Sequence, residues 1–258
     1  AHSEIFMLAP YFLFFGFLIF HLPWWLSAIV AIILTAVTGM LSERIAYRPL
    51  RDAPKISVLI SAIGVSFFLQ NLAIVVFSGI PKSVHRSEFF KTLYQFGGIR
   101  IQSTLIASVI VSAIFLLMLI YIVYKTKTGL AMRAISTDIE TSRLMSVDVD
   151  RTIAITFMIG SALAAVGGIL WGLRFPQLFP WMGMIPGLKA FIAAVVGGIG
   201  NIPGAMLGGM ILGMSEILFV AFLPGLSGYR DAFIFLILIL ILLFKPDGLL
   251  GKNVQEKV

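Results

Sequence analysis

Three polar side chains stand inside long apolar stretches of the sequence. Gln70 and Asn71 are neighbours in "IGVSFFLQNLAIVVF", and Glu216 is the single charged residue between positions 190 and 223. Placing such groups in hydrocarbon costs free energy, so polar residues within membrane spans commonly line substrate or ion pathways. Gln70 and Asn71 could equally hydrogen-bond a neighbouring helix, whereas a carboxylate there is either protonated or faces a polar partner or cavity. We predict that these three residues line a polar pathway.

Catalytic motifs do not accompany these residues. The chain has no cysteine and no G-x-x-x-x-G-K-[ST], so it offers neither a thiol nucleophile nor a P-loop for ATP. "GIGNIP", from Gly198 to Pro203, begins like a dinucleotide-binding motif but follows no strand. His2, His21 and His85 are scattered, without carboxylates at metal-ligand spacing. We expect no catalytic site, no metal and no cofactor bound by this chain, and an intramembrane enzyme is disfavoured.

The composition identifies the solvent as lipid. Of the 258 residues, 59% are hydrophobic and 12% are charged, and the mean hydropathy is +1.03. The net charge of +7 comes from single bases between apolar runs, without a basic patch, which favours lipid headgroups over nucleic acid. No polar stretch could form a second, soluble core. We predict an all-α, polytopic transmembrane bundle that forms a single domain over residues 1–258.

The apolar runs predict about eight membrane segments, since a helical crossing needs about 20 residues. Residues 5–42 suit two helices broken at His21 to Pro23, and residues 57–80, 103–124 and 152–173 suit one each. Residues 190–223 are too long for one crossing, and the Gly-rich "GGIGNIPGAMLGG" in their middle predicts a broken hairpin. The run 232–244 is short for a crossing, and we expect the turn before it, which contains Arg230 and Asp231, to complete the span.

The distribution of Lys and Arg predicts the orientation. Loops 43–55, 125–151 and 245–258 carry twelve bases, and the opposite set carries seven. The first set is therefore predicted to be cytoplasmic. This places the most polar stretch, residues 125–151, on the cytoplasmic face.

Glycines in the predicted hairpin recur at helical spacing. Gly200, Gly204 and Gly208 are four residues apart, and Gly213 follows Gly209 at the same interval. In lipid such faces allow close approach of helix backbones. We expect these glycines to pack helices, and a sliding role during transport is the less favoured alternative.

Residues 130–145 carry a different periodicity. Small and apolar residues recur there every three to four positions, which predicts one short amphipathic helix with no lipid to insert into. Asp138 interrupts the apolar stripe and suits a groove with a polar contact. By itself the pattern favours a solvated helix at the headgroups.

Four stretches together resemble the LivH-type permeases of bacterial branched-chain amino acid ABC importers, over nearly the whole chain. They are "SERIAYRPLRDAPKISVLISAIGVSFFLQN", "TKTGLAMRAISTDIETSRLMSVDVDRTIAITFMIGSALAAVGGIL", "GLKAFIAAVVGGIGNIPGAMLGGMILGMSE" and "YRDAFIFLILILILLFKPDGLLG". LivM-type permeases share the Gly-rich hairpin, but "YRPLR" and Gln70-Asn71 resemble the LivH half. The opening "AHSEIF" resembles the family's N-F-A-H-G-E segment, which normally follows another helix, so we expect that first helix to be missing upstream.

The resemblance implies a pore-forming importer subunit in the bacterial cytoplasmic membrane. Its implied partners are a LivM-type second permease, a periplasmic amino-acid-binding protein and two cytoplasmic ATPases, which would bind the ATP and magnesium. Residues 130–145 would then be the coupling helix that docks into the ATPases, and Thr137 to Met145 would move as a rigid lever. The implied docking residues are Arg133, Ala134, Thr137, Asp138, Ile139, Arg143 and Met145.

Three alternatives to this interpretation stay open at the level of the sequence. A permease for a sugar or another amino acid would differ in its pathway chemistry. A secondary transporter would need ion-coupling acids in the membrane, for which Glu216 is the candidate. A non-transporting assembly protein would show no uptake phenotype on deletion. The amino acid carried is not determined, because an apolar side chain requires only an apolar path.

Overall fold

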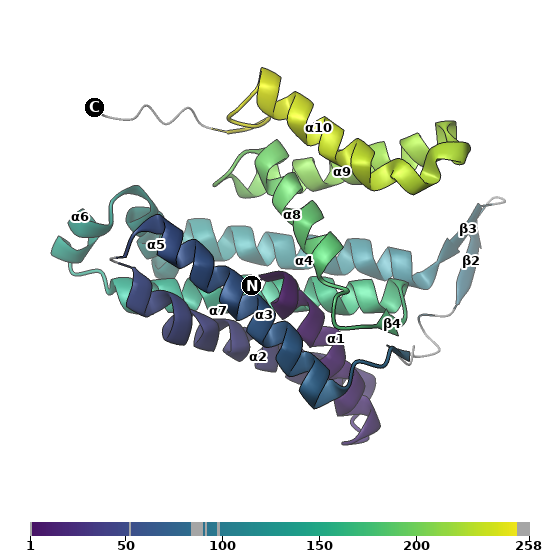
Figure 1. The fold of residues 1–258 in the computed structure, drawn as a ribbon, viewed down its shortest axis with the longest axis horizontal. Coiled ribbons are helices and arrows are strands. Elements are labelled where there is room, and N and C mark those ends of the chain that lie inside the picture. The colour runs from purple at the N-terminus through teal and green to yellow at the C-terminus, as the bar shows by residue number, and fades with distance from the viewer. Residues whose placement is uncertain (1, 52, 84–89, 91, 97–98, 252–258) are drawn as a thin grey trace. The chain divides into compact units, whose positions relative to one another are not determined.

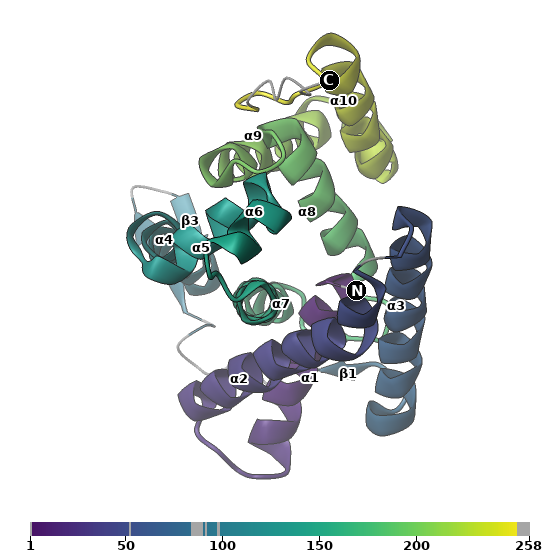
Figure 2. The same cartoon turned by 90° about the vertical axis from the view of Figure 1, so that its left-hand side faces the viewer.

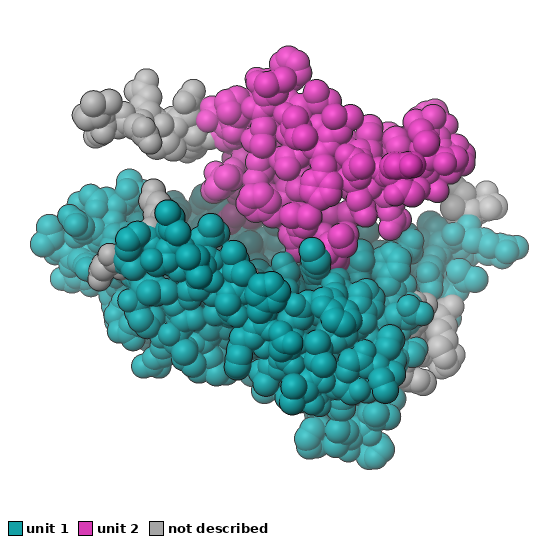
Figure 3. Space-filling view, in the orientation of Figure 1, with its two compact units in different colours: residues 1–184 teal, residues 185–258 magenta. Residues whose placement is uncertain are grey.

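The chain forms two compact units, each with its own helices and core. The computed structural model describes residues 2–51, 53–83, 90, 92–96 and 99–251. Residues 1–184 form unit 1 and residues 185–258 form unit 2, coloured separately in Figure 3. His85 lies outside the described residues, and so do four of the bases used for the charge count, Arg86, Lys91, Lys252 and Lys257. The expectation of a single permease domain stays a prediction.

Unit 1 is built from seven helices and two small pairs of strands within its described residues (Figure 1). A π-helical turn, Glu43–Tyr47, and a 3-10 turn, Arg48–Leu50, follow α2. The elements are α1 (His2–Leu18), α2 (Trp24–Ser42), α3 (Lys55–Phe77), β1 (Lys82–Ser83), β2 (Leu93–Phe96), β3 (Ile99–Gln102), α4 (Ser103–Lys125), α5 (Lys127–Thr137), α6 (Ile139–Leu144), α7 (Val149–Arg174) and β4 (Gln177–Leu178).

The core of unit 1 lies where α1, α2 and α7 pack against one another (Figure 2). The predicted break between the first two helices is confirmed: His21 has a φ of 49°, and Pro23, which cannot continue a preceding helix, caps α2. A Cβ on Gly168 of α7 would overlap the Phe6 carbonyl oxygen of α1. Small residues thus allow the backbones of α1 and α7 to approach.

The strands were not predicted, because the runs that form them are only two to four residues long. β2 and β3 form an antiparallel hairpin, and β1 pairs antiparallel with β4. The second pair joins Lys82 to Leu178 and Ser83 to Gln177, so the loops after α3 and after α7 meet. Two loops that pair must lie on the same side of a membrane. This agrees with the predicted orientation, which places both in the less basic set.

Unit 2 contains α8 (Met184–Gly197), α9 (Ile202–Phe222), a 3-10 turn (Pro224–Tyr229) and α10 (Arg230–Phe244). Its core is formed by Ile192, Val196, Leu212 and Ile234. The break between α8 and α9 confirms the Gly-rich hairpin. Backbone bonds from Leu249 to Val196 (2.8 Å) and from Leu250 to Gly197 (3.0 Å) hold the chain after α10 against this turn.

The predicted number of membrane segments is confirmed. Within the described residues, six helical stretches are long and apolar enough to cross a membrane, and α1 and α8 are shorter apolar helices. The candidate span at residues 224–244 includes the 3-10 turn before α10, so the preceding turn completes this short apolar run as expected. The chain is therefore an all-α, multi-pass bundle of about eight segments with small strand pairs in its loops.

Candidate functional site

The polar segment between α4 and α7 forms two helices, and the prediction of one continuous amphipathic helix over residues 130–145 is wrong. α5 ends at Thr137 and α6 begins at Ile139. Asp138 between them is extended, with φ −158° and ψ 115°. Its carboxylate accepts hydrogen bonds from the amides of Glu140 (2.9 Å) and Thr141 (3.1 Å), so it caps α6. The aspartate that seemed to interrupt an apolar stripe instead starts a new helix.

Capping also sets the protonation of Asp138. The hydroxyl of Thr141 donates to this carboxylate, and the amides of Thr141 and Glu140 act in the same direction, which holds the pKa of Asp138 below its usual value. A lowered folded-state pKa stabilises the fold above the unfolded-state pKa, and this stabilisation is lost as the pH falls through the folded-state value. The cap is therefore complete at neutral pH.

We expect α6 to loosen as the pH is lowered toward the folded-state pKa of Asp138. Hydrogen exchange of the peptide covering residues 138–145, corrected for intrinsic rates, measures this loosening. In Asp138→Asn the side chain still accepts a hydrogen bond, so the cap should persist without the pH response. An equal pH response in both proteins would contradict the assignment.

Of the exposed large apolar side chains of this segment, three lie in α6 or directly after it, and Leu130, which is 61% exposed, lies on α5. Ile139 is 47% exposed, Leu144 85% and Met145 75%. Ser142, by contrast, is buried. Leu144 was missed from the sequence because the periodicity was followed through Asp138 as one continuous helix. The sequence did contain an indication of Leu144: it is a large apolar residue beside Met145 in a stretch that is mostly polar.

The other predicted docking residues take different places. The guanidinium of Arg133 lies over the Tyr124 ring of α4, 5.5 Å from its centroid, so this side chain stabilises the α4–α5 corner. Ala134 is half-buried, and the Thr137 hydroxyl donates to the Arg133 carbonyl (3.1 Å). Arg143 is exposed and borders a concave surface between α5 and α6. That surface has a volume of about 470 Å³ and is also lined by Thr137, Asp138, Ile139 and Glu140.

Gln70 and Asn71 lie together in the middle of α3. Asn71 is exposed, and its side-chain amide donates to the Phe67 carbonyl of its own helix (2.8 Å). Gln70 is half-buried. Because α3 belongs to unit 1 and Glu216 to unit 2, convergence of the three on one pathway stays a prediction.

Glu216 has an ion-pair partner that the sequence did not reveal. Lys189 of α8 bonds both carboxylate oxygens of Glu216, at 3.0 and 3.1 Å, and lies 2.8 Å from an oxygen of Asp231 in α10. Arg230 Nε is 3.5 Å from Glu216. Lys189 and Arg230 are therefore both in ion pairs within unit 2. One acid from α9 and one from α10 compensate two bases, so the group is neutral.

We expect Lys189→Met to lower the free energy of unfolding by about 2 kcal/mol. This is below the 3–5 kcal/mol of a fully buried pair, because both partner side chains are about a fifth exposed. The double variant Lys189→Met with Glu216→Met should recover most of the loss, since no charge is left unpaired. Melting temperatures of the purified proteins in one detergent measure both. A double variant no more stable than the single one would contradict the pairing.

The four glycines predicted to pack helices do not share one role. A Cβ on Gly204 would overlap the Gly197 carbonyl, and one on Gly208 would overlap the Ala193 carbonyl, so both lie where α8 crosses α9. Gly213 has open space around it. Gly200 is in the turn, not on a helix face: its φ of 85° is the left-handed conformation that favours glycine.

The described residues contain no group of three or more potential metal ligands. Six candidate spans and two shorter apolar helices among the described residues define a multi-pass membrane protein. Residues 1–242 match the family model described as branched-chain amino acid transport system, permease component, and the chain belongs to that family.

Individual relatives agree with the family match. The chain is 40% identical over 272 residues to the high-affinity branched-chain amino acid transport system permease protein LivH of Escherichia coli K12, and 37% identical over 271 residues to BraD of Pseudomonas aeruginosa. Each match covers 100% of this chain and 87% of the relative. The xylose transport system permease protein XylH of Escherichia coli K12 is 31% identical over 94 residues, 34% of this chain. No solved structure matches.

Proposed function

We propose that the chain is a membrane-spanning permease subunit of an ABC importer that carries leucine, isoleucine and valine across the bacterial cytoplasmic membrane. The observation that carries the proposal is the similarity over the whole chain to permeases named for branched-chain amino acids, whereas the xylose permease matches a third of it. The chain supplies a path and is not itself an enzyme.

Energy for transport then comes from partners. The chain has no P-loop, and α6 together with the residue after it exposes Ile139, Leu144 and Met145. A short helix with exposed apolar residues suits a groove on another protein. We assign this surface to the cytoplasmic ATPases, which bind the ATP and magnesium, with a LivM-type second permease and a periplasmic binding protein completing the importer.

Uptake in a defined system tests this function. The chain is expressed with its second permease and ATPases, purified as a complex and placed in liposomes with the binding protein outside and ATP inside. We expect ATP-dependent, vanadate-sensitive uptake of labelled leucine, isoleucine or valine, and little uptake of xylose. Vanadate-insensitive uptake driven by an ion gradient would instead indicate a secondary transporter. The absence of any uptake by an assembled complex would overturn the proposal.

A further inference from the structure

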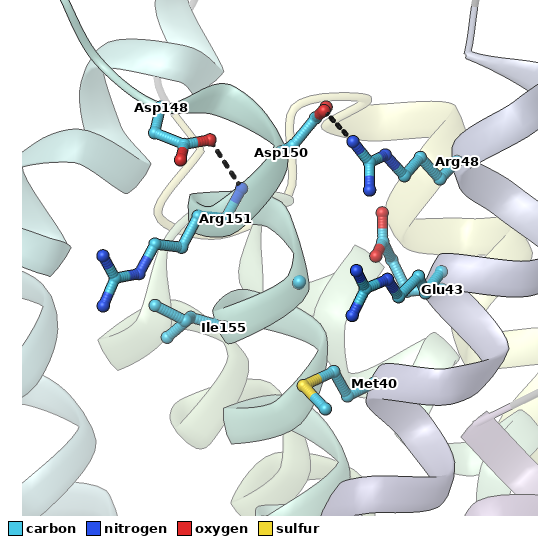
Figure 4. Close-up of a pocket in the computed structure, with 9 residues that line it drawn as sticks. Met40, Glu43, Arg48, Asp148, Asp150, Arg151 and Ile155 are labelled. Atoms are coloured by element: carbon cyan, nitrogen blue, oxygen red, sulfur yellow. Dashed lines mark hydrogen bonds and ion pairs between the residues drawn. The ribbon is translucent and has the colours of Figure 1, made fainter.

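Four charged side chains connect the end of α2 to the start of α7. Arg51 donates to both Glu43 and Asp150, and Arg48 donates to the same Asp150 (Figure 4 shows the Arg48 contact). Asp150 is 99 residues from Arg51 and 102 from Arg48 along the chain. We call Glu43, Arg48, Arg51 and Asp150 the arginine–carboxylate cluster. It bridges the loop after α2 and the segment that carries the proposed docking surface.

The two halves of the cluster differ in burial. The Glu43 side chain is 1% exposed and that of Arg51 is 18% exposed, whereas Asp150 is 44% exposed. A buried carboxylate without its partner strongly destabilises the folded protein, so the Glu43–Arg51 ion pair stays formed. An exposed ion pair is weak and screened by water, so the contacts to Asp150 break and form at little cost. The Glu43–Arg51 pair is thus stable, whereas the ion pairs of Arg48 and Arg51 with Asp150 can break and re-form.

Asp150 follows the docking segment closely. α6 ends at Leu144, and Asp148 caps α7 by accepting from the Arg151 amide (2.9 Å). The connection between the two helices is tied to α6 by backbone bonds from Ser146 to Arg143 (3.1 Å) and from Val147 to Ser142 (3.1 Å). A displacement of α6 therefore reaches Asp150 through a short, hydrogen-bonded link.

The other side of the cluster leads into α2 and α3. Glu43 lies in the π-helical turn that continues α2, and such turns recur at functional sites. The hydroxyl of Ser61 in α3 donates to the Ala46 carbonyl of this turn (3.2 Å). A cavity of about 500 Å³, lined by Met40, Glu43, Arg48, Asp148, Asp150 and Arg151, adjoins the cluster and leaves room for Asp150 to move (Figure 4).

We infer that the arginine–carboxylate cluster is the joint through which movement of α6 reaches α2 and α3, with Asp150 and Arg48 as positioning residues for transport. The inference rests on the proposed function and deepens it. α7 follows α6 directly along the chain, whereas α2 and α3 precede it by about a hundred residues. The packing of α2 against α7 already connects these two helices, and the cluster adds a second, charged connection between the end of α2 and the start of α7, next to α6.

The test compares uptake with ATP hydrolysis in the reconstituted complex. Asp150→Asn and Arg48→Gln each leave the buried Glu43–Arg51 pair intact. We expect both to assemble with the ATPases, to hydrolyse ATP within twofold of wild type and to lose uptake by at least tenfold. Arg44→Gln is the matched control, because Arg44 is exposed in the same π-helical turn and lines the same cavity but forms none of the ion pairs of the cluster. It should keep uptake within twofold.

Three results would overturn the inference. The first is uptake by Asp150→Asn and Arg48→Gln equal to that of Arg44→Gln. The second is a parallel fall of uptake and hydrolysis, because the joint would then not transmit movement selectively. The third is failure of both variants to assemble, which would assign the cluster to folding alone. Wild-type uptake of branched-chain amino acids tests the proposed function separately, since the inference depends on the ratio of variant to wild type.

Discussion

Ile139→Asp is expected to release the ATPases from the permease or to reduce ATP-driven uptake at least tenfold while the membrane bundle stays folded. Ile139 is 47% exposed, and Leu144 at the end of α6 and Met145 after it are still more exposed, so few contacts within the chain are lost. In an apolar groove on a partner, a carboxylate without a compensating charge costs about 2 kcal/mol or more, which is a factor of about 30 in affinity.

Copurification of the ATPases and uptake by the reconstituted complex measure this effect. Ile139→Leu is the matched control, because it keeps the apolar surface and nearly the same volume. Leu144→Asp should reproduce the loss if α6 is the docking helix. A double change at Arg133 and Asp138 should uncouple hydrolysis from uptake by loosening the α4–α5 corner and the cap of α6. Normal copurification and uptake in Ile139→Asp and Leu144→Asp would show that the docking surface lies elsewhere.

Gly208→Leu is expected to prevent correct packing of the α8–α9 hairpin. A Cβ at this position would overlap the Ala193 carbonyl oxygen and lie 2.8 Å from the Gly197 nitrogen, and backbone atoms of a helix cannot move aside as a flexible side chain does. Overpacking of this kind costs about 3 kcal/mol, enough to lower the yield of folded protein severely. The melting temperature and yield of the purified chain measure the effect.

The same helix provides the control for this substitution. Gly213 lies on α9 with open space around the place of a Cβ, so Gly213→Leu should leave the melting temperature of the isolated chain unchanged or raise it slightly. Any loss of complex assembly in that variant would then report a contact with another subunit. Equal destabilisation by both substitutions would show that close packing at Gly208 is not what stabilises the hairpin.

The number and order of the membrane segments followed from the sequence. The transfer of an apolar run into lipid depends on the residues of that run and on little else, so the break at His21 to Pro23 and the Gly-rich turn near Gly200 could be predicted locally. The family resemblance rested on motifs of the same local kind. The absence of a P-loop likewise needed no structure.

Tertiary structure decided which polar groups meet. Lys189 and Glu216 are 27 residues apart, and Asp150 and Arg51 are 99 apart, and neither distance fits a pattern within one helix. Ion pairing of this kind depends on how helices are rotated and stacked, which composition and periodicity do not specify. The break at Asp138 is an intermediate case: the side chain that caps α6 was visible in the sequence, but an aspartate within an apolar stripe fits a helix interior or a cap, and the hydrogen bonds to Glu140 and Thr141 select the cap.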